Sequence, residues 1–196
     1  MAYKPRIEVP GAFYHVVTRG NNKRTIFEDD WDRELFLMLL WTVARLHGWT
    51  IFAYCLMTNH YHLVIQLGPG EKMLSTGMCW LNTAYATEYN RRHGRINHLF
   101  GRRYWSRMLR DDSDVIVNCR YAINNPVRAG MVDDASLWVW SSYRATLGLA
   151  LGIPRLAVDE FLHLFSPRRE RAIELWKEFV DTARSGPDRR QPPLRE

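Results

Sequence analysis

The sequence predicts an α+β fold of the ferredoxin-like class, an antiparallel sheet with helices on one face, followed by a C-terminal helical extension. Two observations predict it. Four β-rich runs, at residues 12–20, 49–57, 60–67 and 104–110, alternate with stretches of helical periodicity. Their order, β, α, β, β, α, β, α, contains the split βαβ pattern. The chain of 196 residues is long enough to bury a hydrophobic core.

The first half of the chain supplies a strand, a helix and a hairpin. AFYHVVTRG (12–20) reads as a strand that ends at Gly20. A helix follows from Asp30, with Asp29 or Asp30 as N-cap and Gly48 as its end. Its apolar face is expected to consist of Trp31, Leu35, Met38, Leu39, Thr42, Val43 and Leu46. The runs 49–57 and 60–67 are separated by two polar residues, a hairpin signal.

The second half adds a long helix over residues 72–92 and a strand at 104–110. Ser113 is the expected N-cap of the next helix, which ends near Asn125 because Pro126 follows. Two more helices are expected within 156–183, the second opening with Ser166 as N-cap and Pro167 as first helical residue. We expect a domain over residues 1–150, a helical extension over 151–184 and a disordered tail over 185–196.

Charge and cysteine content indicate which class of partner and which cellular compartment to expect. Twenty-seven Lys and Arg against 21 Asp and Glu give a net charge of +6, which favours a polyanionic partner. Arginine supplies most of this charge and suits phosphate, so nucleic acid is favoured over a membrane. Three cysteines without paired spacing predict reduced thiols. With no apolar leader and an apolar run too short to span a bilayer, a cytoplasmic protein is expected.

The segment TNHYHLVIQL places two histidines on one strand. Because side chains alternate, His60 and His62 share a face with Val64 and Gln66, and Tyr61 lies on the opposite, core-facing side. Such a pair can bind a metal ion, protonate a phosphate or be two half-exposed strand residues. Val64 removes the third histidine that a histidine-triad nucleotide hydrolase would need.

Two histidines leave a divalent ion short of ligands, and the helix DVIVNCRYAIN offers more. Tyr121 and Asn125 are four residues apart and so face the same way. Asn125 could supply an amide oxygen, and Tyr121 a nucleophile whose phenolate a cation would stabilise. The simpler alternatives are a core aromatic for Tyr121 and a helix C-cap for Asn125.

Several motifs in order resemble one family: HVVTRGNNKRTIF, MTNHYHLVI, YNRRHGRINHLFGRRYWS, CRYAINNPVRAGMV and WSSYRATLG. The sequence closely resembles the REP-associated tyrosine transposases, of the single-tyrosine (IS200-like) family of HUH endonucleases. The resemblance implies His60, His62 and Asn125 as ligands of Mg²⁺ or Mn²⁺, and Tyr121 as the catalytic nucleophile. It further implies cleavage of single-stranded DNA beside a hairpin through a 5′-phosphotyrosine, by a monomer or a homodimer.

Residues 89–107 interleave cations with aromatic rings, as single-stranded DNA recognition requires. The predicted DNA contacts are Arg19, Lys23, Arg24, Arg91, Arg92, Arg95, Arg102, Arg103, Tyr104, Trp105, Arg107 and Arg128. The alternative for this segment is a solvated basic loop with core aromatics. Two other functions stay open: a non-catalytic nucleic-acid binder on the same scaffold, and a metal-dependent phosphodiesterase for small substrates, against which the arginine-rich segment argues.

Overall fold

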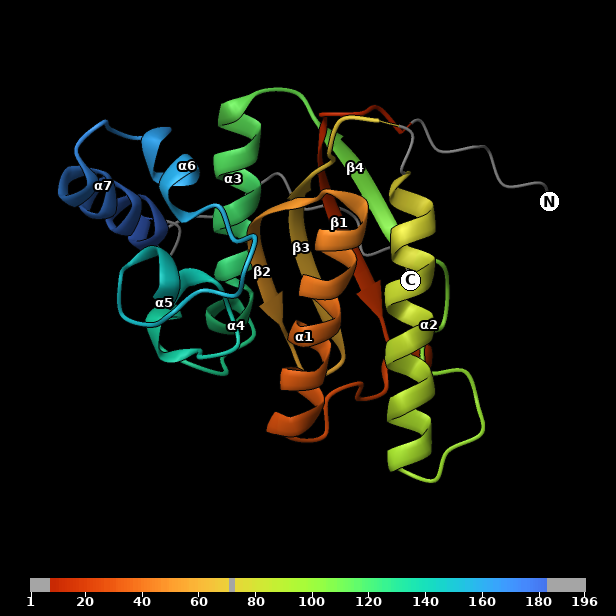
Figure 1. The fold of residues 1–196 in the computed structure, drawn as a ribbon. Coiled ribbons are helices and arrows are strands. Elements are labelled where there is room, and N and C mark those ends of the chain that lie inside the picture. Colours follow the sequence, from red (N-terminus) through yellow and green to blue (C-terminus); the bar gives the residue numbers. More distant parts are fainter. Residues whose placement is uncertain (1–7, 71–72, 183–196) are drawn as a thin grey trace.

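The structure, a computed structural model, describes residues 8–70 and 73–182. Four strands form one antiparallel sheet in the order β2-β3-β1-β4 (Figure 1). They are β1 (Phe13–Arg19), β2 (Thr50–Leu56), β3 (His60–Gln66) and β4 (Trp105–Leu109). This order, with α1 (Asp30–His47) and α2 (Leu74–Arg92) as crossovers, is the predicted ferredoxin-like arrangement.

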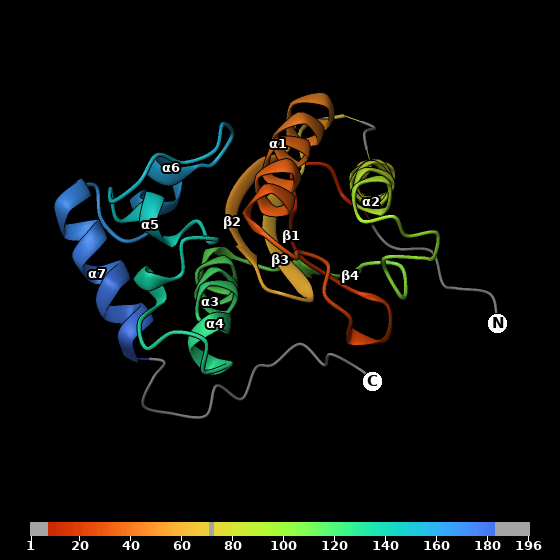
Figure 2. The same cartoon turned by 90° about the horizontal axis from the view of Figure 1, so that it is seen from below.

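The sheet separates two hydrophobic clusters (Figure 2). The larger cluster joins α1 and α2 to the face that carries Tyr61, Leu63 and Ile65. The second cluster lies on the opposite face, where α3 (Asp112–Ile123) packs its Val115 against Val64 and its neighbours. The two crossover helices therefore lie on one face as predicted, and α3 adds a layer over the face that carries the histidines.

Helix α1 begins and ends where predicted but buries a different face. The Asp29 carboxylate accepts from the Asp32 N–H at 3.1 Å, and Gly48 ends the helix with φ of 68°. The buried apolar residues are Phe36, Leu40, Val43 and Ala44. The prediction that Trp31, Met38 and Leu46 belong to the core face was wrong, since all three are exposed. Helix α1 carries apolar side chains on most of its sides, so periodicity alone does not select one face.

The β2–β3 hairpin is tied to the end of β1. Gly20 N–H donates to the Asn59 carbonyl at 2.8 Å, and Ile26 N–H donates to the Thr58 carbonyl at 3.0 Å. In the β1–β3 register Arg19 lies opposite His60, and Val17 opposite His62. The hairpin turn therefore places both histidines at the end of the sheet where the chain leaves β1 through the short helix η1 (Asn21–Lys23).

Two helix starts differ from the prediction. Asp111, not Ser113, is the N-cap of α3, because its carboxylate accepts from the Asp114 N–H at 2.8 Å. Helix α7 (Arg169–Thr182) begins two residues after Pro167, which is therefore not its first residue, while the Ser166 hydroxyl accepts from Arg168 N–H at 3.1 Å. The chain between them forms α4 (Asn125–Arg128), η2 (Ala135–Leu137), α5 (Tyr143–Thr146) and α6 (Val158–His163).

The C-terminal helices pack on the helix that carries Tyr121. Trp176 of α7 is fully buried and shares the second hydrophobic cluster with Ile123 of α3. Asn124 donates to the carbonyl of Val180 at 3.0 Å, and the Arg120 guanidinium lies 3.9 Å from the Phe179 ring centroid. The extension is thus a support for α3. The predicted tail, 185–196, lies outside the described residues. Within those residues no helix is long and apolar enough to cross a bilayer.

Candidate active site

His60 and His62 are adjacent on one face of β3 and both are buried, 8% and 0% exposed. Their ring centroids are 5.1 Å apart. Burial, with a smaller contribution from Arg19, lowers the pKa of His60 to about 4. Burial also lowers the pKa of His62 well below its usual value, helped by His15 and His60. Both imidazoles are therefore neutral at pH 7, the form that binds metal.

Each imidazole has one nitrogen without a partner in the described part of the chain. Nε2 of His60 and Nε2 of His62 are buried and make no hydrogen bond to the described residues. Both Nδ1 atoms, by contrast, are bonded: to Asn59 Oδ1 at 2.7 Å for His60 and to His15 Nε2 at 3.0 Å for His62. Buried nitrogens without partners are costly, and a metal ion would satisfy both. This donor set fits a divalent cation.

Tyr121 lies beside these histidines. Its ring centroid is 5.6 Å from that of His62 and 5.8 Å from that of His15, in edge-on geometry. The side chain is 6% exposed, and the Arg128 guanidinium lies over its ring at 4.8 Å. The helix places it there: Asp114, Asn118 and Tyr121 follow one another at helical spacing on α3.

The C-cap of α3 is Asn124 rather than Asn125, which is the first residue of α4, although the Asn125 side chain bonds the last turn of α3. Its Nδ2 donates to the carbonyls of Tyr121 at 2.7 Å and Ala122 at 3.3 Å. Both bonds use the amide nitrogen, so they are compatible with a ligand role for the oxygen. In the described part of the chain no three His, Cys, Asp or Glu residues gather as a metal site. An amide oxygen such as that of Asn125 is a suitable ligand for a hard divalent cation.

The comparisons with known proteins decide the family. A family model described as "Transposase IS200 like" matches residues 8–125, more than half of the chain. This chain belongs to the IS200-like transposase family. A Haemophilus influenzae protein assigned by name to the REP-associated tyrosine transposases is 28% identical over 100 residues, which span 46% of this chain and 57% of that relative. A solved structure of a REP-associated tyrosine transposase bound to a REP hairpin superposes with a TM-score of 0.63 and 19% identity, covering 76% of this chain and 88% of its own.

In this IS200-like transposase, sequence reasoning missed His15. It lies on β1, fully buried, with its Nε2 3.0 Å from Nδ1 of His62. The signal was present in FYHVV, where a histidine interrupts an otherwise apolar strand. Only the β1–β3 register, which pairs Val17 with His62, reveals that His15 shares the histidine face.

Four of the predicted DNA contacts lie around the histidine face. Arg19 is opposite His60, and Arg128 covers the Tyr121 ring. The Trp105 ring centroid is 5.6 Å from that of His15. Arg107 makes two bonds to the Asp114 carboxylate, at 2.8 and 3.0 Å. Arg128 thus borders the tyrosine, Arg19 and Trp105 border the histidines, and the charge of Arg107 is already paired.

Most of the other predicted contacts are exposed, and several of them are paired with neighbouring side chains. Lys23, Arg24, Arg91, Arg102 and Arg103 are exposed, and Arg91 pairs with Glu88 at 2.9 Å. Arg92 is paired with Asp29 and the buried Asp32, and it lies 4.8 Å from the Trp31 ring centroid. Arg95 donates to the Tyr89 hydroxyl at 3.0 Å. Tyr104 is 5% exposed within the larger cluster, a position that favours packing over base stacking.

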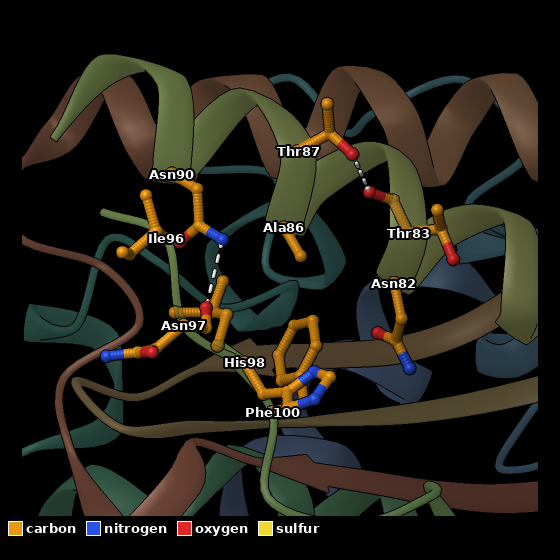
Figure 3. A pocket seen from close by; sticks show the side chains of 10 residues that line it. Asn82, Thr83, Ala86, Thr87, Asn90, Ile96, Asn97, His98 and Phe100 are labelled. Carbon is orange, nitrogen blue, oxygen red and sulfur yellow. Dashed lines mark hydrogen bonds between the residues drawn. The ribbon is translucent and has the colours of Figure 1, made fainter. Parts of the chain in front are cut away.

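A pocket of about 450 Å³, lined by both polar and apolar side chains, lies on α2, away from the histidine face (Figure 3). One wall carries Asn82, Thr83, Thr87 and Asn90, and the other is the segment 96–100. Asn90 Nδ2 donates across to the Asn97 carbonyl at 3.0 Å. The pocket contains none of the predicted catalytic residues, so the catalytic hypothesis rests on the histidine face alone.

Proposed function

We propose that this transposase is a metal-dependent single-stranded DNA endonuclease and strand transferase. The observation that carries the proposal is the contact of Tyr121 with His62, which, like the adjacent His60, is buried and has an Nε2 without a partner among the described residues. His60, His62 and Asn125 would bind Mg²⁺ or Mn²⁺, and the bound ion would polarise the scissile phosphate and stabilise a phenolate.

Each residue of the proposed reaction has one task. The Tyr121 phenol loses its proton to solvent, and its oxygen attacks phosphorus in line. The P–O3′ bond breaks, the departing 3′ oxygen takes up a proton, and the 5′ phosphate stays on the tyrosine. Arg128 and Arg19, which lie beside the site, would offset the negative charge of the phosphate. Because one phosphoester replaces another, the step is reversible and suits strand transfer.

The proposed partner is single-stranded or hairpin DNA. The net charge of +6 and the exposed cations of residues 91–103 support it. The solved relative that shares this fold is bound to a REP hairpin. Tyr121 and both histidines come from one chain, which supports a monomer as a sufficient catalytic unit. A cytoplasmic location would give it access to DNA.

A non-catalytic DNA binder is the second candidate. It is favoured by the burial of Tyr121, whose side chain is only 6% exposed and lies under Arg128. A nucleophile must reach its substrate, so α3 or Arg128 would have to shift for catalysis.

One assay separates the two candidates. The protein is incubated with a single-stranded oligonucleotide that contains a hairpin, with Mn²⁺ or with EDTA, and run on a denaturing gel. A transposase gives a Mn²⁺-dependent protein–DNA species that is absent from Tyr121→Phe. The control Tyr54→Phe, whose buried ring lies in the larger cluster, should retain this species. Retarded hairpin DNA without any such species would instead establish the binder.

A further inference from the structure

Behind His62 runs a chain of buried polar groups. His62 Nδ1 is 3.0 Å from His15 Nε2, and His15 Nδ1 is 3.0 Å from Asn118 Oδ1. His62, His15 and Asn118 are 0%, 0% and 5% exposed. A line of hydrogen bonds that is shielded from bulk solvent thus connects β3, β1 and α3.

The asparagine at the α3 end of this line of hydrogen bonds determines which atom donates at each step. Asn118 Nδ2 donates to the Asp114 carbonyl at 2.7 Å and to its carboxylate at 3.1 Å. Burial acts to raise the pKa of Asp114, but the bonds from Arg107 and Arg110 outweigh it and lower that pKa. The carboxylate therefore stays an acceptor. With two acceptors beside its nitrogen, the Asn118 amide must turn its oxygen towards His15.

From this orientation the protonation of each imidazole follows. A neutral imidazole has one N–H and one lone pair. Asn118 Oδ1 only accepts, so His15 must donate through Nδ1, which leaves its Nε2 as an acceptor. His62 must then donate through Nδ1, which leaves a lone pair on Nε2. That nitrogen is the buried atom for which residues 8–70 and 73–182 supply no partner.

The tautomer of His60 is set in the same way, but by one asparagine that bonds it directly. Asn59 Nδ2 donates to the Lys23 carbonyl at 3.0 Å, so its Oδ1 faces His60 Nδ1 at 2.7 Å. His60 therefore also carries its proton on Nδ1 and a lone pair on Nε2. Two separate asparagine amides, Asn59 and Asn118, leave the two histidines with the same free nitrogen.

We propose that His15 is a positioning residue, which, with Asn118 behind it, holds His62 in the Nδ1–H tautomer with Nε2 ready to bind a metal ion. The metal-binding part rests on the proposed function. In the other tautomer His62 would present an N–H to the cation and could not bind it. Groups that orient a metal-binding histidine typically change metal affinity about 10–100-fold.

The tautomers can be read without any metal. Long-range ¹H–¹⁵N correlation spectra of the apo protein, with ¹⁵N-labelled histidine, should show His15, His60 and His62 protonated on Nδ1 at pH 7.5. His15→Phe should free His62 to change tautomer, whereas His15→Gln, whose amide oxygen can accept from Nδ1, should preserve it. A wild-type spectrum with His62 protonated on Nε2 would overturn the inference.

Metal affinity supplies the second readout. Mn²⁺ titrations should show a loss of about 10–100-fold for His15→Phe, partial recovery for His15→Gln and no change for His163→Phe, an exposed histidine on α6. Unchanged affinity in His15→Phe would refute the positioning role and leave the proposed function intact. Wild-type protein with the expected tautomers but no Mn²⁺ binding would instead refute the proposed metal site, and with it the metal role of His15. The spectra of wild type and His15→Gln decide the tautomer even if His15→Phe does not fold.

Discussion

The Tyr121 ring of α3 lies edge-on to the His62 imidazole of β3, with centroids 5.6 Å apart. Strand β3 is part of the split βαβ sheet, whereas α3 follows that sheet in the sequence and lies outside the motif. They meet because α3 returns across the histidine face after the sheet is complete. Helix α7 fixes α3 in this position from the outer side, through Arg120 and Asn124.

Substitution of a proposed metal ligand and substitution of the proposed nucleophile should have different effects. We expect His60→Ala to weaken Mn²⁺ binding at least about tenfold and to abolish the covalent DNA species, because it removes one of the buried nitrogens. Tyr121→Phe should abolish the covalent species but bind Mn²⁺ as wild type does. Calorimetry and denaturing gels measure the two effects. Equal Mn²⁺ affinity in His60→Ala and wild type would remove His60 from the metal site.

Acid should destabilise the metal-free protein. Burial lowers the pKa of both His15 and His60 to about 4, from about 6.5 in an unfolded chain. Below pH 6.5 the unfolded chain therefore binds more protons than the folded one, so the free energy of unfolding should fall as pH drops from about 6.5 to 4. Urea unfolding at a series of pH values measures the slope, which should be smaller in His15→Gln. An equal slope in that variant would mean that His15 is not held neutral.

Two arginines of the basic segment should behave in opposite ways. Arg102 is exposed, so Arg102→Ala should weaken hairpin binding and reduce the salt slope by about 1, with little change in melting temperature. Arg92 is paired with Asp29 and the buried Asp32, so Arg92→Ala should mainly lower the melting temperature. Binding titrations at several salt concentrations and thermal melts distinguish them. A loss of affinity in Arg92→Ala without a change in melting would assign that side chain to DNA.

The C-terminal extension should contribute strongly to stability. Trp176 is fully buried, contacts the Phe161 ring at 4.8 Å and donates to the Thr146 hydroxyl at 3.1 Å. Trp176→Ala should therefore cost about 3–5 kcal/mol in the free energy of unfolding. The matched control is Trp80→Ala on α2, whose tryptophan is 37% exposed and should matter far less. Chemical denaturation measures both, and similar losses would contradict the supporting role of α7.

Local pattern was enough to predict most of the sheet. Alternation placed His60 and Tyr61 on opposite faces of a strand, and the structure confirms that Tyr61 enters the larger cluster. The Asp29 cap and the Gly48 stop of α1 are equally local, because each depends on a few neighbouring residues. The core face of α1 is not local, and its prediction failed where apolar residues surround most of the helix.

By itself the sequence determined the order of strands and helices and the shared face of His60 and His62. Tertiary structure alone decided that Tyr121 meets His62, that His15 completes the histidine face, and that Arg92 and Arg107 pair with Asp32 and Asp114. The physical reason is the distance along the sequence over which each interaction acts. Periodicity and caps act over a few residues, whereas strand register and helix docking depend on burying surfaces far apart in the chain.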